Sequence, residues 1–196
     1  MAAPAAAGVV AWPVPYRVRL ALRLGEALVF SIVVGVLIWG ISNLFLDLPL
    51  VWMVPLGFLS GGAATQRTFG VTLYDRGRRM ALALLCALLA YQVTQVGDYL
   101  HFRSQMRRRY AAADYRRTPA EIDAALAADL TAKTGYSGVL GYAGAALQEG
   151  QPVLFNLRLR GVWLAGFWLA ELGLALYVAG RWAAGPKPRA APEGGS

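Results

Sequence analysis

The stretch ALVFSIVVGVLIWGISNLFL, residues 27 to 46, contains twenty residues without a charged side chain. Twenty apolar residues in a helix extend for about 30 Å, which is the thickness of the hydrocarbon core of a membrane. Arg17, Arg19 and Arg23 precede the stretch. A secretory signal would have a shorter apolar core and a small-residue cleavage site after it. The stretch therefore predicts a transmembrane helix that the mature protein retains.

The composition of the whole chain supports this class. The 196 residues are 57% hydrophobic and only 15% charged, with a mean hydropathy of +0.45, which is typical of an integral membrane protein. The net charge of +8 comes from basic residues at the edges of apolar runs, where they meet lipid headgroups, so no nucleic-acid partner is expected. One cysteine, Cys86, and one histidine, His101, exclude an intrachain disulfide and predict neither a metal site nor a cofactor.

Three further apolar runs complete the predicted architecture, an all-α fold with a four-helix transmembrane bundle. Asp47 is the expected N-cap of the second span, with Pro49 in its first turn. The predicted organisation is a basic lead at 1–25, three spans within 26–100, a partly helical extramembrane loop at 101–160, a fourth span at 161–182 and a disordered tail at 183–196. The first three spans are expected at 27–46, 48–64 and 80–100.

Small residues mark the surfaces on which these helices are expected to pack. Gly57 and Gly61 form a GxxxG pair with Gly62 beside them, and Ser31 with Gly35 gives the first span a similar face. Such faces let helix backbones approach closely in lipid. A packing face inside one bundle is the favoured interpretation, and a kinked helix that lines a path or a dimer seam is the alternative.

The long loop carries its own helix signals. An apolar stripe from Tyr99 to Ala113 predicts that the third helix continues beyond the bilayer. Thr118 to Glu121 reads as a capping box, so we expect short helices at about 119–133 and 137–148. They would form a cap over the bundle or lie on lipid, with a ligand-binding lid as the alternative. The residues expected at lipid headgroups are Arg107, Arg108, Arg109, Trp163 and Trp182.

The order of three spans, a loop and a last Trp-rich span resembles a group of uncharacterised bacterial four-pass membrane proteins. The matching stretches are PLGFLSGGAATQRTFG, QVGDYLHF, GYAGAALQEGQPV and GVWLAGFWLAELGLALYVAGRW. The resemblance covers roughly residues 25 to 182 and implies no known activity. It implies a bacterial inner-membrane location, and relatives with an N-terminal zinc ribbon imply a cytoplasmic N-terminus. The basic residues next to short loops favour the same orientation, with both termini inside and residues 101–160 outside.

One acid, Glu171, lies near the middle of the fourth span, between Trp163 and Trp182. Acids within spans face the bundle interior or water and commonly mark functional sites. The third span places Tyr91, Gln92, Gln95 and Asp98 toward its end, and antiparallel packing would bring the first three near Glu171. A hydrogen-bonded strut between two helices is the favoured interpretation, and a proton or ion site or a contact with a partner subunit are the alternatives.

Three functions follow as hypotheses. The first is a non-catalytic scaffold, assembly factor or accessory subunit that holds a protein partner or a second copy of itself within the bilayer. The second is a small proton- or ion-linked transporter or channel that uses Glu171. The third is a lipid-acting enzyme with Asp98, His101 and Arg103 at the bilayer edge. Because no catalytic arrangement is present at a supporting spacing, we expect a protein that is not an enzyme, with no catalytic residues.

Overall fold

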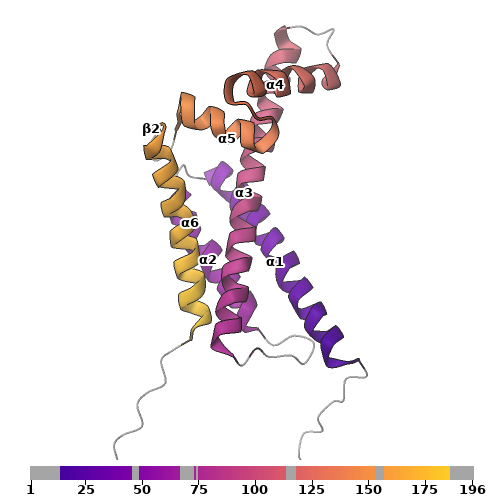
Figure 1. Cartoon of the computed structure of the whole chain (residues 1–196), viewed down its shortest axis with the longest axis vertical. Coiled ribbons are helices and arrows are strands. Elements are labelled where there is room, and N and C mark those ends of the chain that lie inside the picture. The colour runs from indigo at the N-terminus through magenta and orange to yellow at the C-terminus, as the bar shows by residue number, and fades with distance from the viewer. Residues whose placement is uncertain are drawn as a thin grey trace, which may run out of the picture.

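The computed structural model describes residues 14–45, 49–66, 73, 75–113, 118–152 and 157–185. These residues form six helices and one short hairpin (Figure 1). The helices are α1 (Tyr16–Phe45), α2 (Pro49–Thr65), α3 (Arg76–Ala113), α4 (Pro119–Thr134), α5 (Gly138–Glu149) and α6 (Val162–Ala183). Strand β1 (Gln151–Pro152) pairs antiparallel with β2 (Arg158–Leu159), with Gln151 opposite Leu159.

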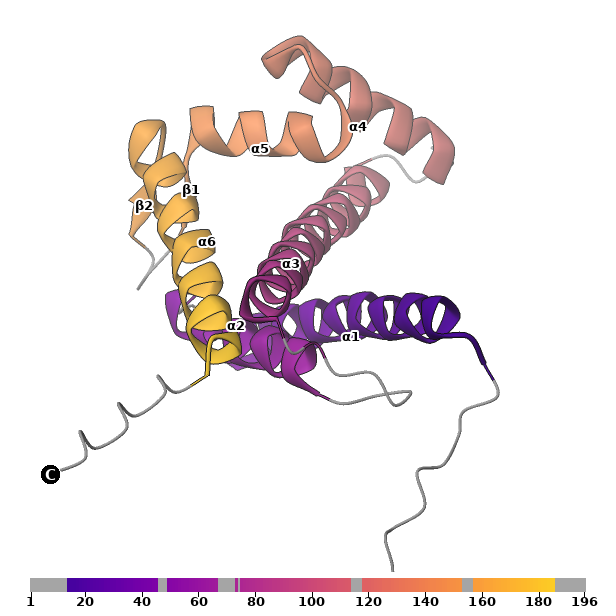
Figure 2. The same cartoon turned by 60° about the horizontal axis from the view of Figure 1, so that its bottom comes forward.

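The helices α1, α2, α3 and α6 alternate in direction and pack against one another. The helix α2 contacts α1, α3 and α6, and α3 contacts α1 and α6. The helix α3 continues past the other three, and α4 and α5 lie at its far end (Figures 1 and 2). The first residue of α1 and the last residue of α6 lie at the opposite end, at the bottom of Figure 1. The predicted all-α class is therefore confirmed.

Three of these helices are long and apolar enough to cross a membrane: α1, α3 and α6. The helix α2 is a shorter apolar helix. Large apolar side chains such as Val29, Val36 and Leu169 are exposed on the outer surface, which suits a protein embedded in a membrane. The helix α1 begins eleven residues before the predicted span, because its first turns include the basic segment. Asp47 and residues 186–196 lie outside the described residues.

Glycines in α1 and α2 allow the closest helix contacts. A Cβ atom added at Gly57 would lie 2.5 Å from the carbonyl oxygen of Ala175, and one added at Gly61 would lie 2.7 Å from that of Ala179. The backbones of α2 and α6 therefore touch along this seam. Gly35 plays the same part between α1 and α3. Gly62 does not, because the nearest atom to its added Cβ is 3.9 Å away on Trp182.

We call the end of the bundle at the bottom of Figure 1, where α1 begins and α2 ends, the closed end. Arg23 is 1% exposed and its guanidinium group donates to the carbonyl oxygens of Ala63 and, at 2.9 Å, of Gln66. These carbonyls end α2, where a helix lacks internal donors for them. We call the buried Arg23 side chain the plug. Next to it, Ala27 and Cys86 are buried, and the Cys86 thiol lies 3.6 Å from the carbonyl oxygen of Ala27.

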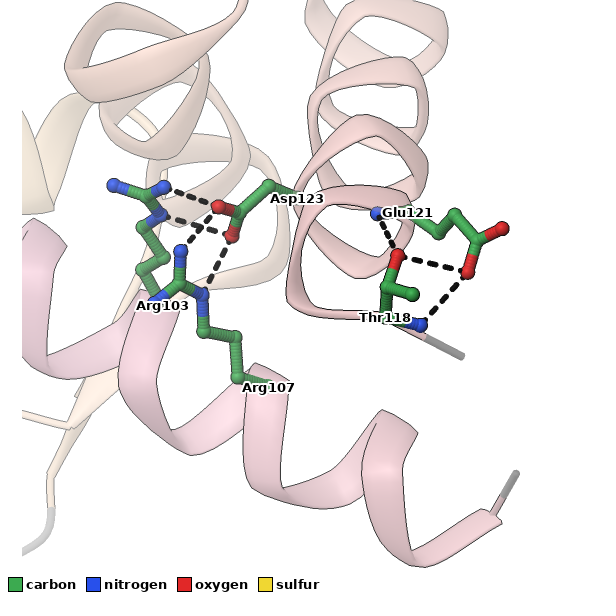
Figure 3. Close-up of polar contacts among 5 residues, drawn as sticks. All are labelled: Arg103, Arg107, Thr118, Glu121 and Asp123. Carbon is green, nitrogen blue, oxygen red and sulfur yellow. Dashed lines mark hydrogen bonds and ion pairs between the residues drawn. The ribbon is translucent and has the colours of Figure 1, made fainter. Parts of the chain in front are cut away.

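The helices α4 and α5 form a cap at the other end, which we call the cap end. The helix α4 begins with the predicted capping box: the Thr118 amide donates to Glu121 over 2.7 Å, and the Glu121 amide donates to Thr118 over 3.3 Å (Figure 3). The predicted extension of α3 is confirmed as well. Its apolar stripe packs against the buried cap residues Leu126, Leu130 and Ala145 through Tyr99, Phe102 and Met106.

A charged clamp fixes the cap to α3. Asp123 on α4 accepts hydrogen bonds from the guanidinium groups of both Arg103 and Arg107 on α3 (Figure 3). Arg107, which was expected at the lipid headgroups, is held by Asp123 through its guanidinium group. Arg108 and Arg109 are exposed. On the far side of the cap, Lys133 joins the two helices through Glu149, at 3.1 Å.

Candidate functional site

An inner cavity of about 90 Å³ lies between α1, α2, α3 and α6. Two carboxyl groups line it, Asp98 from α3 and Glu171 from α6. Its other lining residues with polar groups are Trp39, Ser42, Trp52, Thr94, Gln95, Gln151 and Trp168. One water molecule needs roughly 10–15 Å³ of such space. The inner cavity therefore has room and hydrogen-bonding groups for several waters.

Glu171 lines the inner cavity from α6 and is 4% exposed. It lies eight residues after Trp163, or about 12 Å along the helix. The Tyr91 side chain interacts with the Glu171 carboxyl group, while the Tyr91 hydroxyl donates to the carbonyl oxygen of Trp168 over 3.2 Å. The antiparallel helices α3 and α6 thus approach each other at Tyr91, as predicted. Gln95 and Glu171 both line the inner cavity.

Asp98 is held in place by α1. The indole nitrogen of Trp39 donates to Asp98 Oδ1 over 3.1 Å. Trp39 has room beside α3 because a Cβ atom at Gly97 would lie 2.7 Å from its ring. A glycine next to an acid thus allows one large ring to cover that acid. The QVGDY sequence therefore supplies the carboxyl group of Asp98 and, at Gly97, the space for the Trp39 ring that donates to it.

Two buried polar atoms at the inner cavity have no protein partner in the described part of the chain. They are the indole nitrogen of Trp52 and the side-chain carbonyl oxygen of Gln151. Buried polar groups nearly always have a hydrogen-bond partner, and ordered water supplies it where the protein does not. Both atoms could therefore receive a hydrogen-bond partner from ordered water in the inner cavity.

A larger cavity, the vestibule, lies at the cap end and measures about 620 Å³. It lies between the end of α1, α3, α5 and the β1–β2 hairpin. Its charged lining residues are Asp98, Arg109, Glu149 and Arg158, and His101 and Gln105 lie among them. Asp98 belongs to both the vestibule and the inner cavity. The two cavities are therefore neighbours around one carboxyl group.

Tyr142 on α5 forms part of the vestibule wall. Its ring packs against Phe102, with ring centroids 5.0 Å apart, and its hydroxyl accepts a hydrogen bond of 3.4 Å from the Gln151 amide. Burial raises the pKa of Tyr142 to about 12, and the negative charge of Asp98 raises it too, while the Gln151 contact has a small opposing effect. The hydroxyl therefore stays protonated at physiological pH and keeps a donor for the vestibule.

The other predicted site residues lie elsewhere. Gln92 is exposed and is not among the lining residues of the inner cavity. It lines an apolar groove of about 410 Å³ between α3, α5 and α6. Trp163 is 75% exposed and Trp182 is 49% exposed, at opposite ends of α6, and Trp182 also packs on Phe58. Ser31 is buried and donates to the Ala27 carbonyl oxygen of its own helix.

The three residues of the lipid-enzyme hypothesis have separate partners. Asp98 is bonded to Trp39, His101 lies 2.8 Å from the Gln105 amide nitrogen, and Arg103 is bonded to Asp123. This geometry offers no support for a catalytic unit of these residues. Within the described ranges, no three His, Cys, Asp or Glu side chains gather where they could hold a metal ion.

Of the inner cavity's lining residues, sequence reasoning named only Gln95, Asp98 and Glu171, and the polar ones that it missed include Trp39, Ser42, Trp52 and Gln151. Trp39, Ser42 and Trp52 lie in apolar runs, where a tryptophan or serine has no distinctive spacing. Gln151 lies in a Gly-Gln-Pro turn that reads only as a helix end. The pairing of Gly97 with Asp98 was the one available signal, because a small residue beside an acid leaves room for a covering ring.

No known protein family, curated protein or solved structure matches the chain.

Proposed function

We propose that α1, α2, α3 and α6 all cross the membrane as one four-helix bundle in a bacterial inner membrane. The helix α2 has 17 residues, about 25 Å at 1.5 Å per residue, and a bilayer accommodates a short span by local thinning. Its packing against three spanning helices and its exposed Val51, Val54 and Phe58 support this assignment.

The orientation proposed is that of the sequence analysis: both termini in the cytoplasm and the cap outside. The closed end then carries the basic flanks of α1, α3 and α6 on the cytoplasmic side, as the distribution of Lys and Arg in membrane proteins favours. Single cysteines at the exposed positions Ala124 and Gln66, in a Cys86→Ser background, test it with a membrane-impermeant thiol reagent in intact cells. Labelling at residue 124 alone is expected, and labelling at residue 66 alone would reverse the orientation.

We further propose that the protein binds a proton at Glu171 in the inner cavity. The observation that carries this function is that two carboxyl groups and two unpartnered buried polar atoms line one space between the helices. A carboxyl group in a wet cavity exchanges a proton with water, whereas one sealed among apolar side chains does not. Tyr91 and Asp98 are the ionisable groups that interact with Glu171.

The residues around the site have separate roles in this proposal. Glu171 binds the proton, and Asp98 with its Trp39 donor forms the polar wall facing it. Tyr91 ties α3 to α6 through the Trp168 carbonyl oxygen. Because Arg23 plugs the closed end, a proton bound at Glu171 returns to the cap end unless the helices move. The protein would then act as a small proton-linked transporter, alone or with a protein partner.

A non-catalytic scaffold or accessory subunit is the second candidate. The feature in its favour is the glycine seam of α2 on α6, because such a rigid interior does not favour the helix movements that transport needs. A scaffold also needs no cofactor, and its partners would be the lipid bilayer and a protein partner or a second copy of this chain.

The infrared band of a protonated carboxyl group separates the two candidates. In the purified protein, the difference spectrum against Glu171→Gln isolates the Glu171 band, and Asp98→Asn does the same for Asp98. The proposed function predicts that the Glu171 band disappears and returns reversibly as the pH is raised and lowered. A band that keeps its full intensity over the whole range in which the protein stays folded would make Glu171 a neutral strut and favour the scaffold.

A further inference from the structure

Three side chains line both the vestibule and the inner cavity: Ser42, Asp98 and Gln151. They come from the end of α1, from α3 and from strand β1. They are therefore the boundary that anything passing between the two spaces must cross. We call these three residues the neck.

The hydrogen bonds of the neck leave oxygen atoms free. Ser42 donates its hydroxyl hydrogen to the carbonyl oxygen of Trp39 over 2.9 Å, so the lone pairs of its oxygen remain available. Asp98 receives one donor at Oδ1, from Trp39. Gln151 donates its amide hydrogen to Tyr142, while its carbonyl oxygen is buried without a partner. Oxygen acceptors suit water and the hydrated proton rather than an anion.

At the closed end, Arg23, Ala27 and Cys86 are buried, and the Arg23 guanidinium group places a positive charge among them. A proton approaching from that side would have to pass a cation held in a dry environment, where charges interact strongly. The neck is thus the favoured entrance.

We propose that the neck is the entrance through which protons, carried by water from the vestibule, reach Glu171, and that Gln151 supplies the decisive acceptor. This inference rests on the proposed function, since it names the route to the same site. In each exchange, a hydrated proton that reaches the neck from the vestibule gives its proton to the Glu171 carboxylate and leaves a neutral water molecule. In the reverse step, the Glu171 carboxyl group gives its proton to a water at the neck, and the hydrated proton returns to the vestibule.

The position of Gln151 depends on the cap. Its backbone belongs to the hairpin that follows α5, and its amide is held by Tyr142 of α5. Tyr142 in turn packs on Phe102 and Tyr99 of α3. A ligand or partner that moved the cap would therefore move the acceptor at the entrance.

The test is the rate at which the protonated Glu171 band shifts after transfer of the protein into D₂O. The variant Gln151→Leu keeps a similar volume and removes the acceptor, and we expect exchange at least tenfold slower than in the wild type. Gln151→Glu keeps an oxygen there, and its exchange is expected within threefold of the wild-type rate. Gln148→Leu makes the same change three residues away, on the exposed face of α5, and is expected to leave the rate unchanged.

The outcomes separate the two proposals. If the wild-type band neither titrates nor exchanges, the proposed function fails before the route is in question. If the wild-type band titrates and exchanges but Gln151→Leu is as fast as Gln148→Leu, the neck is overturned and the proton site stands. If Gln151→Leu does not fold, Gln151→Glu decides, because exchange more than tenfold slower in that variant would contradict an acceptor role.

Discussion

The two ends of the bundle differ in the size of the side chains at which their helices meet. At the closed end, the small residues Gly57 and Gly61 bring two helix backbones into contact, and the space between helices is filled. At the cap end, the rings of Trp39, Trp52 and Trp168 stand between the helices and leave the inner cavity among them. Side-chain size at the helix contacts thus distinguishes the seam where the backbones touch from the region where a cavity remains.

The difference extends to the charged groups. Arg23 at the closed end is buried, and one terminal nitrogen of its guanidinium group donates to two carbonyl oxygens at the end of α2. The carboxyl groups of Asp98 and Glu171 instead line a cavity with room for water. The buried cation is held by the main chain of a neighbouring helix, whereas the two carboxyl groups form the candidate site.

Removing the plug should have the largest effect. Arg23→Met leaves the carbonyl oxygens of Ala63 and Gln66 without their donor, and hydrogen bonds to a charged group contribute about 1.5–3 kcal/mol each. We expect a loss of about 3 kcal/mol in the free energy of unfolding, measured by tryptophan fluorescence during detergent denaturation. Arg19→Met, an arginine one turn earlier on α1, is the control. Equal losses in both variants would contradict the role of the plug.

The glycine seam should be the next most sensitive feature. In Gly57→Ala, the added methyl group meets the backbone of α6, which cannot move aside, and overpacking of this kind costs about 1–3 kcal/mol. We expect a loss of about 2 kcal/mol in the same denaturation experiment. The matched control is Gly173→Ala on α6, where an added Cβ has no neighbour within 4 Å. A change of less than about 0.5 kcal/mol in Gly57→Ala would show that the seam does not hold the two helices.

The same substitution at the cap end should cost less stability and change the site more. In Gly97→Ala, the methyl group meets the ring of Trp39, a side chain that can turn away, and we expect a loss of about 1 kcal/mol. Turning the ring breaks its bond to Asp98. The infrared carboxyl band of Asp98 should therefore shift in Gly97→Ala and stay unchanged in Gly57→Ala. A shift of equal size in both variants would remove the distinction between the two ends.

The smallest effect expected concerns the clamp of the cap, whose side chains are partly exposed. Hydrogen bonds from Arg107 and Arg103 hold the pKa of Asp123 below its usual range. A lowered pKa in the folded state means that the clamp stabilises the cap above the ordinary carboxyl pKa, about 3.9. This contribution is lost as the pH falls from there through the folded-state pKa.

Amide hydrogen exchange of α4, corrected for the intrinsic effect of pH, measures this loss. Protection is expected to decrease at acidic pH and in high salt, which screens exposed ion pairs. Asp123→Asn should have low protection at every pH. Asp129→Asn, which alters an exposed pair on the same helix, should behave as the wild type. Identical acid dependence in wild type and Asp123→Asn would contradict the clamp.

The sequence predicted features whose cause is local. The capping box at Thr118 and the apolar stripe of α3 depend on neighbouring residues of one helix, so their spacing is sufficient evidence. The position of Glu171 in its span followed from the two flanking tryptophans in the same way. Gly57 and Gly61 were recognised because a GxxxG pair is also local.

Features that join distant segments escaped prediction. The plug joins Arg23 to residues 40 and 43 positions later, and as a sequence feature Arg23 resembles any basic residue flanking a span. The pairing of Trp39 with Asp98 crosses 59 positions. Gln92 was grouped with the site because it lies next to Tyr91, although neighbouring residues of a helix face different directions. The inner cavity results from four helices together, and no single helix encodes it.

In the proposed function, Glu171 exchanges protons with the cap end only. Proteoliposomes with one orientation of the protein and membrane-impermeant buffers allow the pH to be changed on one side at a time while the Glu171 band is followed. The Glu171 band is predicted to respond within the mixing time when the pH on the cap side is changed. When the pH on the other side is changed, the band is predicted to respond only at the rate at which the vesicles leak protons. A fast response to the closed side, or equal responses to both, would contradict the account.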